Sequence, residues 1–257
     1  MDSPQKKTKW FIAIKKREKD LFNLSGLKRW KTPNEKYEAD PFIIKYQGKN
    51  YLFYEDYDRR KGVISYSIIE GLRISQPTKI LDLPYHLSYP QVFKEGNEIY
   101  LMPESGAERK IQLFKAVDFP DKWELARTLL DDGYYADSNI FRYKDKWWLF
   151  TTAGHDNHLI ILKGTSLFGR WEKHFDGIIL NSRGAGNIFE YQGRLIRPVQ
   201  DESRVYGGAI IFKEITLPNY SEKIVGRIEP DWHPHLIGTH TFNFSEDYVV
   251  IDGKIKV

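Results

Sequence analysis

The sequence predicts an all-β protein folded as a five-bladed β-propeller, in which each blade is a sheet of four antiparallel strands. The first observation is a β-hairpin pattern over residues 37–55, where a polar turn separates an apolar run from an aromatic one. The pattern returns at steps of 49, 48 and 48 residues, so that equivalent positions are Asp40, Tyr89, Asp137 and Ala185. The second observation is an aromatic content of 15%, with 7 Trp and 16 Tyr, which favours strands.

Each unit of the repeat supplies short strands in the same order. The strands expected in the first two units are 41–46, 51–55, 63–68, 79–81, then 89–93, 100–104, 111–116 and 123–126. Those expected in the third and fourth units are 137–141, 148–150, 159–163, 171–174, then 185–189, 196–198 and 208–212. No segment has sustained apolar spacing at i, i+3, i+4 and i+7, so long helices are not expected.

A fifth, looser copy of the repeat covers residues 240–251 and supplies fewer than the four strands of a blade. We expect the isolated apolar run at residues 10–14 to complete this last blade and close the ring. The chain then divides into a lead-in of residues 1–36 and a propeller of residues 37–257, which together form a single domain.

The net charge of +4 arises from 39 basic and 35 acidic residues, and much of the excess lies near the N-terminus. We interpret this basic cluster as a solvated strand and its flank, so no nucleic-acid partner is expected. Its members are Lys6, Lys7, Lys9, Lys15, Lys16, Arg17 and Lys19.

Cysteine is absent, so the fold must depend on its core rather than on disulfides. No apolar run approaches the roughly 20 residues of a membrane span, and no signal peptide is recognisable, so we expect a soluble, cytoplasmic protein. No glycine-rich phosphate loop is present, and His233 and His235 lie in a loop interrupted by proline. We therefore expect neither a cofactor nor a metal site.

Candidate functional residues come from the starts of the innermost strands, which meet at one mouth of a propeller channel. The repeat places Asp40, Tyr89 and Asp137 there, with His240 as the nearest polar candidate in the fifth unit. We expect the side chains of Asp40, Asp137 and His240 to share this mouth, although each Asp would also serve as a turn cap.

Further polar residues lie close in register to these strand starts. Glu104, Gln200 and Asp201 end the second strands of their units, as Glu55 does in the first. Near the fourth opening stand Arg183, Asn187 and Arg197. An arginine beside two acids can hold a carboxylate, a phosphate or a pair of sugar hydroxyls, and it can equally form a salt bridge between blades.

These motifs carry a family resemblance. The segment Ala39–Phe42 with its hairpin resembles the first blade of the propellers of glycoside hydrolase family 43. A closer resemblance, over about residues 39–252, is to the N-terminal domain of plant glucosamine inositolphosphorylceramide transferase and its bacterial counterparts. It depends on the segments 84–90, 102–104, 146–150, 197–201 and 238–243. The resemblance implies a carbohydrate-related role, with a glycan as ligand or substrate and a glycosyltransferase or other glycan-assembly enzyme as partner.

The family 43 resemblance implies roles for individual residues. Asp40 matches the general base that activates water, and Asp137 matches the acid that orients and tunes the others. The general acid of that family is a Glu at the start of blade four, where this chain has 183–186, Arg-Gly-Ala-Gly, and no carboxyl group. Glu104 or Asp201 would have to donate the proton instead, and an inverting hydrolase needs its two carboxyl groups about 6.5–9.5 Å apart.

Three functions are compatible with these residues. The first is an enzyme that acts on a glycosidic bond through paired carboxylates. The second is a non-catalytic glycan-binding propeller that serves surface-polysaccharide or glycolipid biosynthesis, in which Arg183, Asn187, Arg197, Gln200, His240 and Tyr89 would contact the sugar. The third is a scaffold whose polar mouth is structural.

Overall fold

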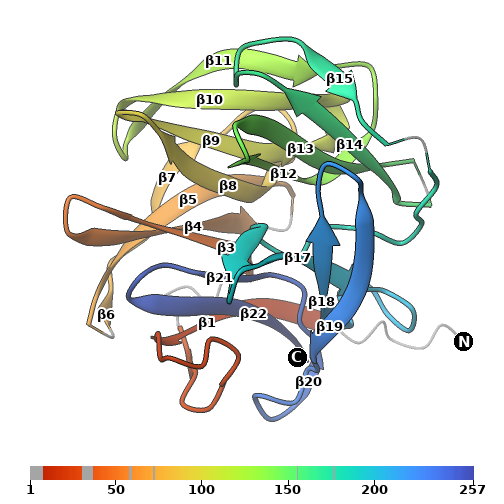
Figure 1. Ribbon diagram of the computed structural model, residues 1–257. Helices are drawn as coiled ribbons and strands as arrows, with labels where there is room; N and C mark the ends of the chain where they lie inside the picture. The colour runs from red at the N-terminus through yellow and green to blue at the C-terminus, as the bar shows by residue number, and fades with distance from the viewer. Residues whose placement is uncertain (1–7, 31–36, 58–59, 72, 155, 176) are drawn as a thin grey trace, which may run out of the picture.

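A computed structural model describes residues 8–30, 37–57, 60–71, 73–154, 156–175 and 177–257 of the chain (Figure 1). Five antiparallel sheets follow one another around a common centre, which confirms the predicted five-bladed propeller. The described residues contain a single short helix, the 3-10 turn η1 (Gly106–Glu108). Lys6 and Lys7 of the basic cluster lie outside the described residues.

The blades follow the repeat in chain order. Blades one and two are formed by β3 (Tyr37–Tyr46), β4 (Lys49–Tyr57), β5 (Gly62–Glu70), β6 (Arg73–Ile74) and β7 (Thr78–Leu81), then β8 (Ser88–Glu95), β9 (Glu98–Ser105), β10 (Lys110–Asp118) and β11 (Lys122–Leu130). Blades three and four are formed by β12 (Tyr135–Tyr143), β13 (Lys146–Ala153), β14 (His158–Gly164) and β15 (Trp171–Lys173), then β16 (Phe189–Tyr191), β17 (Arg194–Asp201), β18 (Ala209–Thr216) and β19 (Ser221–Ile228). Of these strands, β6 and β19 are the two that the repeat did not predict.

The fifth blade joins the two ends of the fold. It combines β20 (Leu236–Gly238), β21 (Phe242–Phe244) and β22 (Tyr248–Lys256) with β1 (Thr8–Lys16) and β2 (Lys28–Arg29). β1 pairs with β22 along its whole length, and the two strands lie side by side in Figure 1. The expectation that residues 10–14 complete the last blade is therefore confirmed.

The core lies between blades rather than inside any one of them. Each neighbouring pair of sheets encloses one cluster of buried apolar side chains, as expected when sheets pack face to face. Representative members are Phe53, Leu113, Phe150, Phe212 and Tyr54, one for each interface. Because every blade shares its core with two neighbours, the ring positions the inner strands firmly.

The inner strands of the first three blades share a backbone irregularity at the predicted site. Asp40, Tyr89 and Asp137 have φ angles of 52°, 45° and 46°, in the left-handed region that these residue types seldom adopt. At each of them the pairing with the second strand is interrupted, as in a β-bulge. Such bulges redirect side chains and are frequent beside functional sites.

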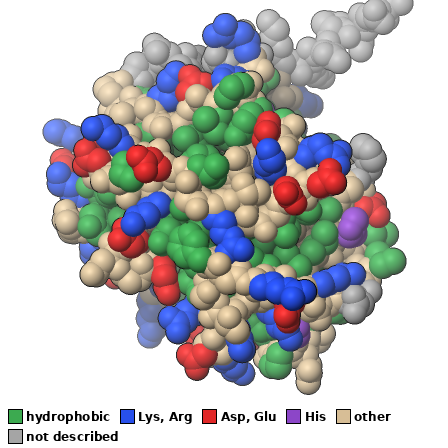
Figure 2. Space-filling model, turned by 90° about the horizontal axis from the view of Figure 1, so that it is seen from above, with side chains coloured by type: hydrophobic (Ala, Val, Ile, Leu, Met, Phe, Trp, Pro, Cys, Tyr) green, Lys and Arg blue, Asp and Glu red, His purple; other side chains and the backbone are tan. Residues whose placement is uncertain are grey.

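No helix among the described residues is long and apolar enough to cross a membrane. On the face shown in Figure 2, basic and acidic side chains are interspersed and do not gather by sign.

Candidate functional site

A polar pocket of about 450 Å³ opens at the mouth where the inner strands begin. All five blades contribute to its wall. Its chemically distinctive side chains are Asp40 and Glu55 from blade one, Glu104 from blade two, Tyr134 beside blade three, Arg183 beside blade four and His240 from blade five. The repeat therefore brings residues far apart in sequence to a single opening.

Asp40 is buried at the base of this pocket and is held by neighbouring blades. Its Oδ1 accepts a hydrogen bond of 2.7 Å from the Thr241 hydroxyl, and its Oδ2 accepts one of 3.2 Å from the Tyr89 N–H. Burial raises the pKa of Asp40 to about 6, although the nearby His240 opposes the shift. This carboxyl group is thus held in a fixed orientation and is mostly ionised at neutral pH.

His240 lies beneath the Trp10 ring and beside two acids. The two rings are stacked with centroids 3.8 Å apart, and His240 Nδ1 lies 2.6 Å from Asp252 Oδ2 and 3.8 Å from Asp40 Oδ1. Burial alone would lower the pKa of His240, but Asp252 and Asp40 raise it above its ordinary value. The two acids therefore favour the positively charged form of His240 at the base of the pocket.

Asp40, His240 and Asp252 have ligand atoms within 4.8 Å of one another, a spacing that would suit a metal ion. However, the Asp252 carboxylate already accepts bonds from four protein donors: the N–H groups of Asp40, His240 and Thr241, and His240 Nδ1. Since these donors occupy its lone pairs, we interpret the cluster as an ion pair that joins blades five and one.

Asp137 is buried just below the pocket and tunes its other side. Its Oδ2 accepts bonds of 2.7 Å from Arg183 Nε and 2.8 Å from Gln200 Nε2, while its own N–H donates to Glu104 Oε2 at 2.9 Å. Burial, followed by the Asp137 charge, raises the pKa of Glu104 to about 8, with Arg183 opposing. Glu104 is thus mostly protonated at neutral pH.

Glu55 is a pocket residue that the sequence reasoning did not select. Its Oε1 lies 3.3 Å from His86 Nε2, and His86 Nδ1 accepts a 2.8 Å bond from the Gly62 N–H, so the imidazole proton resides on Nε2. Burial raises the pKa of Glu55 well above its ordinary value, and Asp40 adds to the shift. Burial also lowers the pKa of His86, which keeps this histidine neutral.

A signal for Glu55 existed in the repeat. In each of the first three blades, the residue just before the left-handed position pairs with a residue of the second strand. The pairs are Ala39 with Glu55, Ser88 with Glu104, and Ala136 with Thr152. Glu55 and Glu104 both line the pocket, so the same register that selected Glu104 also indicates Glu55.

Three predicted residues lie away from the pocket. The Tyr89 side chain fills the channel below it, where its hydroxyl accepts bonds from the Gly186 N–H at 2.7 Å and from Asn139 Nδ2 at 2.9 Å. Arg197 is buried in blade four, where Nη1 donates to Ser182 Oγ at 2.8 Å. Hydrogen bonding by Ser203 and the ion pair with Arg227 at 2.7 Å lower the pKa of Asp201 to about 2, which does not suit a proton donor.

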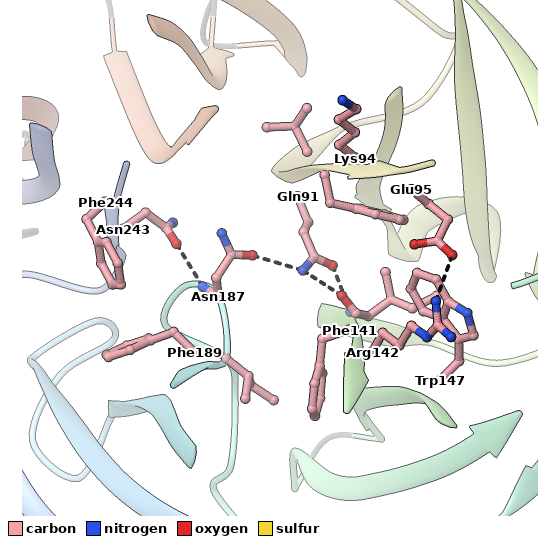
Figure 3. Close-up of a pocket in the computed structure, with 14 residues that line it drawn as sticks. Gln91, Lys94, Glu95, Phe141, Arg142, Trp147, Asn187, Phe189, Asn243 and Phe244 are labelled. Carbon is pink, nitrogen blue, oxygen red and sulfur yellow. Dashed lines mark hydrogen bonds and ion pairs between the residues drawn. The ribbon is translucent and has the colours of Figure 1, made fainter. Parts of the chain in front are cut away.

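Asn187 faces the opposite mouth of the channel, where a second pocket of about 340 Å³ lies (Figure 3). Three amide side chains form a row there, because Gln91 Nε2 donates to Asn187 Oδ1 at 2.9 Å and the Asn187 N–H donates to Asn243 Oδ1 at 2.8 Å. The structure thus separates Asn187 from Arg183, which stands only four residues earlier.

The missing carboxyl group of blade four has a steric cause. A Cβ atom on Gly184 would lie 2.6 Å from the Asp137 carbonyl oxygen and 2.7 Å from the Tyr89 hydroxyl. Gly186, with a φ of 126°, would place a Cβ 2.0 Å from the Phe242 carbonyl oxygen. No side chain fits at either position, so Arg183 is the charged group that this blade presents.

The comparison with solved structures shows the fold. The chain superimposes on a thermostable family-43 glycoside hydrolase with a TM-score of 0.57 and 14% identity, covering 79% of this chain and 82% of that one. It superimposes on the catalytic domain of Coprinopsis cinerea GH62 alpha-L-arabinofuranosidase with a TM-score of 0.60 and 11% identity, covering 84% and 90%. At these identities, the shared property is the propeller itself.

The sequence comparison is more specific. The family described as glucosamine inositolphosphorylceramide transferase 1, N-terminal, matches residues 27–227. Glucosamine inositolphosphorylceramide transferase 1 of Oryza sativa subsp. japonica is 34% identical over 203 residues, and that of Arabidopsis thaliana is 31% identical over 205 residues. Each match covers 72% of this chain. It covers only 27% of the rice relative and 26% of the Arabidopsis relative, so the chain spans about a quarter of the length of these relatives. The chain belongs to the family of the N-terminal domain of glucosamine inositolphosphorylceramide transferase 1.

Proposed function

We propose that the 450 Å³ pocket binds a sugar residue of a glycan and performs acid–base chemistry on its glycosidic bond, with Asp40 as general base and Glu104 as general acid. The supporting observation is that both groups line this one pocket while their environments hold their pKa values apart, at about 6 and about 8. When the environment separates the pKa values of two carboxyl groups in this way, the group with the lower pKa is assigned as the base and the other as the acid. The family and the propeller fold add a carbohydrate-related setting.

The hydrogen bonds around each group are consistent with these roles. Glu104 Oε2 accepts the Asp137 N–H, so the proton of the neutral carboxyl group belongs on Oε1. In the proposed step, Asp40 takes a proton from water as the water oxygen attacks the anomeric carbon. Glu104 gives its proton to the leaving oxygen, and the glycosidic bond breaks to two free hydroxyl products. Burial, followed by the negative charge of Asp137, raises the pKa of Glu104 and keeps it protonated.

Turnover of a panel of glycosides by the purified protein and two variants tests this proposal. We expect Asp40→Asn to lower turnover by roughly 10²–10⁴-fold on every substrate. Glu104→Gln should do so only for substrates with a poor leaving group, because an activated aryl glycoside needs no proton. Asp201→Asn, outside the pocket, serves as the matched control and should keep wild-type turnover. Absence of turnover by the wild-type protein on all glycosides would contradict the proposal.

A second candidate function is glycan binding without catalysis, in the service of a glycosyltransferase or another glycan-assembly enzyme. It is favoured by the blade-four segment 183–186, which carries no carboxyl group and has no room for a side chain at Gly184 or Gly186. It also agrees with relatives that are named as transferases and are about four times longer than this match. In that case Asp40→Asn has no turnover to remove and should weaken sugar binding by about 1–3 kcal/mol, measured by calorimetry.

A further inference from the structure

We infer that the pocket at the opposite mouth of the channel is a second ligand site, which binds one uncharged sugar unit through the side-chain amide of Asn187 and the aromatic rings around it. The inference goes beyond the proposed function, because this 340 Å³ pocket shares no lining residue with the 450 Å³ pocket. It follows from the orientation of three amide groups, the charges of the lining and its aromatic side chains.

The row of amides at this mouth has one orientation, because the backbone of β12 determines it. Gln91 Oε1 accepts the Ile140 N–H at 2.7 Å, and Gln91 Nε2 donates to the Ile140 carbonyl oxygen at 3.0 Å. The same Nε2 lies 2.9 Å from Asn187, so Asn187 must present its oxygen to Gln91 and direct its Nδ2 elsewhere. Figure 3 shows this nitrogen projecting from the row.

The Asn187 side chain supplies a hydrogen-bond donor to the pocket. Within the described part of the chain, Asn187 Nδ2 is the amide nitrogen of this row that has no protein acceptor. Gln91 Nε2 has two acceptors, and Asn243 Nδ2 donates to the Pro41 carbonyl oxygen at 2.8 Å. A polar group held in a fixed direction within a mainly apolar wall is the feature that orients a small ligand. The ligand must therefore offer an acceptor, such as a hydroxyl or ring oxygen.

The buried part of this pocket carries no charged side chain. Its charged lining residues are Lys94, Glu95 and Arg142, and all three are at least partly exposed. Arg142 Nη1 lies 3.6 Å from Glu95 Oε1, and the Lys94 ammonium group points away from the amide row in Figure 3. A charged group placed beside Asn187 would lose its hydration without gaining a countercharge. The pocket therefore favours an uncharged ligand.

Aromatic side chains supply most of the apolar contact surface. Phe93, Phe141, Phe189 and Phe244 line the pocket and are half-buried, and the last two meet edge to face with ring centroids 4.9 Å apart. Such rings can pack against the apolar C–H face of a sugar while the amide donor reaches one of its oxygens. A volume of about 340 Å³ lies near the lower end of the range for ligand pockets, which suits a single sugar unit.

An uncharged peptide is the alternative ligand, and the backbone geometry disfavours it. Extended peptides bind sheet edges through backbone hydrogen bonds. Here the amide side chains already occupy backbone groups at the inner edges. Gln91 bonds both the N–H and the carbonyl group of Ile140 in β12. Asn243 donates to the Pro41 carbonyl group in β3 and accepts the Asn187 N–H at 2.8 Å. A sugar needs no such edge, since ring faces and an amide donor are sufficient.

Fluorine NMR of the protein labelled with 5-fluorotryptophan tests the inference, because each pocket has one tryptophan in its lining. Trp147 reports on the second pocket and Trp10 on the first. The probes are the methyl glycosides of glucose, galactose, mannose and xylose, with the uncharged peptide acetyl-Gly-Phe-Gly-amide for comparison. We expect at least one glycoside to shift the Trp147 signal saturably, and at a lower concentration than the peptide requires.

Two variants and a control identify the contacts. Asn187→Asp keeps the oxygen that accepts Gln91 Nε2 but replaces the free donor by an acceptor. It should weaken glycoside binding by about tenfold or more in the Trp147 titration. Phe189→Leu should weaken it several-fold, because it removes a ring face. Asn219→Asp, the same substitution in the exposed turn between β18 and β19, is the matched control and should bind as the wild type does.

The outcomes separate this inference from the proposed function. A Trp147 signal that no glycoside moves, or that the peptide moves at a lower concentration than every glycoside, overturns the inference. A glycoside affinity that Asn187→Asp leaves unchanged also overturns it. Glycosides that shift the Trp10 signal alone overturn it and leave the first pocket standing. If Asn187→Asp does not fold, the wild-type titration and Phe189→Leu decide.

Discussion

At the scale of single residues, Glu104 couples the stability of the protein to pH. The fold raises its pKa from 4.5 to about 8, so the folded state favours the protonated form. Its contribution to stability is fully present below about pH 4.5 and is lost as the pH rises through about 8. Asp40 has the same sign in a lower window, between 3.8 and about 6.

Glu104→Gln should remove this dependence, because the glutamine carbonyl can still accept the Asp137 N–H but cannot ionise. We expect the variant to melt close to the wild-type temperature at pH 5 and several degrees above it at pH 8.5. Thermal unfolding across this pH range is the measurement. A variant that loses stability relative to wild type as the pH rises would show that Glu104 is ionised in the fold.

The repeat predicts well which residues lie at equivalent places in the blades. It predicts poorly which way a side chain points, because a shift of one residue turns it to the opposite face of the strand. Asp40, Asp137 and His240 gather at one mouth because they occupy equivalent strand starts. Gln200 and Asp201 are adjacent in β17, so their side chains point to opposite faces: one reaches Asp137 and the other Arg227. Asn187 lies four residues beyond Arg183, and within that span the chain passes from the first pocket to the second. Neither outcome is visible in residue type.

At the scale of elements, β1 contributes to both the last blade and the pocket through Trp10. This side chain is 2% exposed and stacks on His240. Trp10→Ala should cost about 3–5 kcal/mol of unfolding free energy, because it opens a large cavity between strand and pocket. Chemical denaturation measures this loss. Leu125→Ala on β11, where the side chain is 53% exposed, should change it by less than about 0.5 kcal/mol.

The sequence identifies inner strands more reliably than outer ones, for a physical reason. Inner strands pack against two neighbouring blades and are apolar over most of their length, as β3 is. The outermost strand β19 is exposed or half-exposed at all but its last position, so it carries no periodic apolar signal. β2 is only two residues long and is defined by its pairing with β1, which no local pattern encodes.

At the scale of the whole molecule, the pairing of β1 with β22 predicts that these two strands can be linked directly and the chain opened at another place. Thr8 lies opposite Lys256, so a short turn can connect them as a hairpin. A circular permutant that begins at Tyr37, crosses this turn and ends at Trp30 should unfold cooperatively, within a few degrees of the wild-type melting temperature. The same chain without residues 8–30 should not fold, because β22 then loses β1, with which it pairs along its whole length. A permutant that fails to fold would contradict the closure described here.

Closure of the ring also requires two strands that the ribosome makes at widely separated times. Lys16 and Tyr248 are partners separated by 232 positions in the chain (248 − 16). At ~5–20 residues per second, a ribosome needs roughly 12–50 s to cover that distance. Throughout this interval Phe11 and Ile12, which are fully buried in the finished fold, lack β22, the strand that pairs with β1 along its whole length. A product truncated before β22 therefore keeps an apolar strand exposed, which makes it a target for chaperones and proteases until β22 has been made.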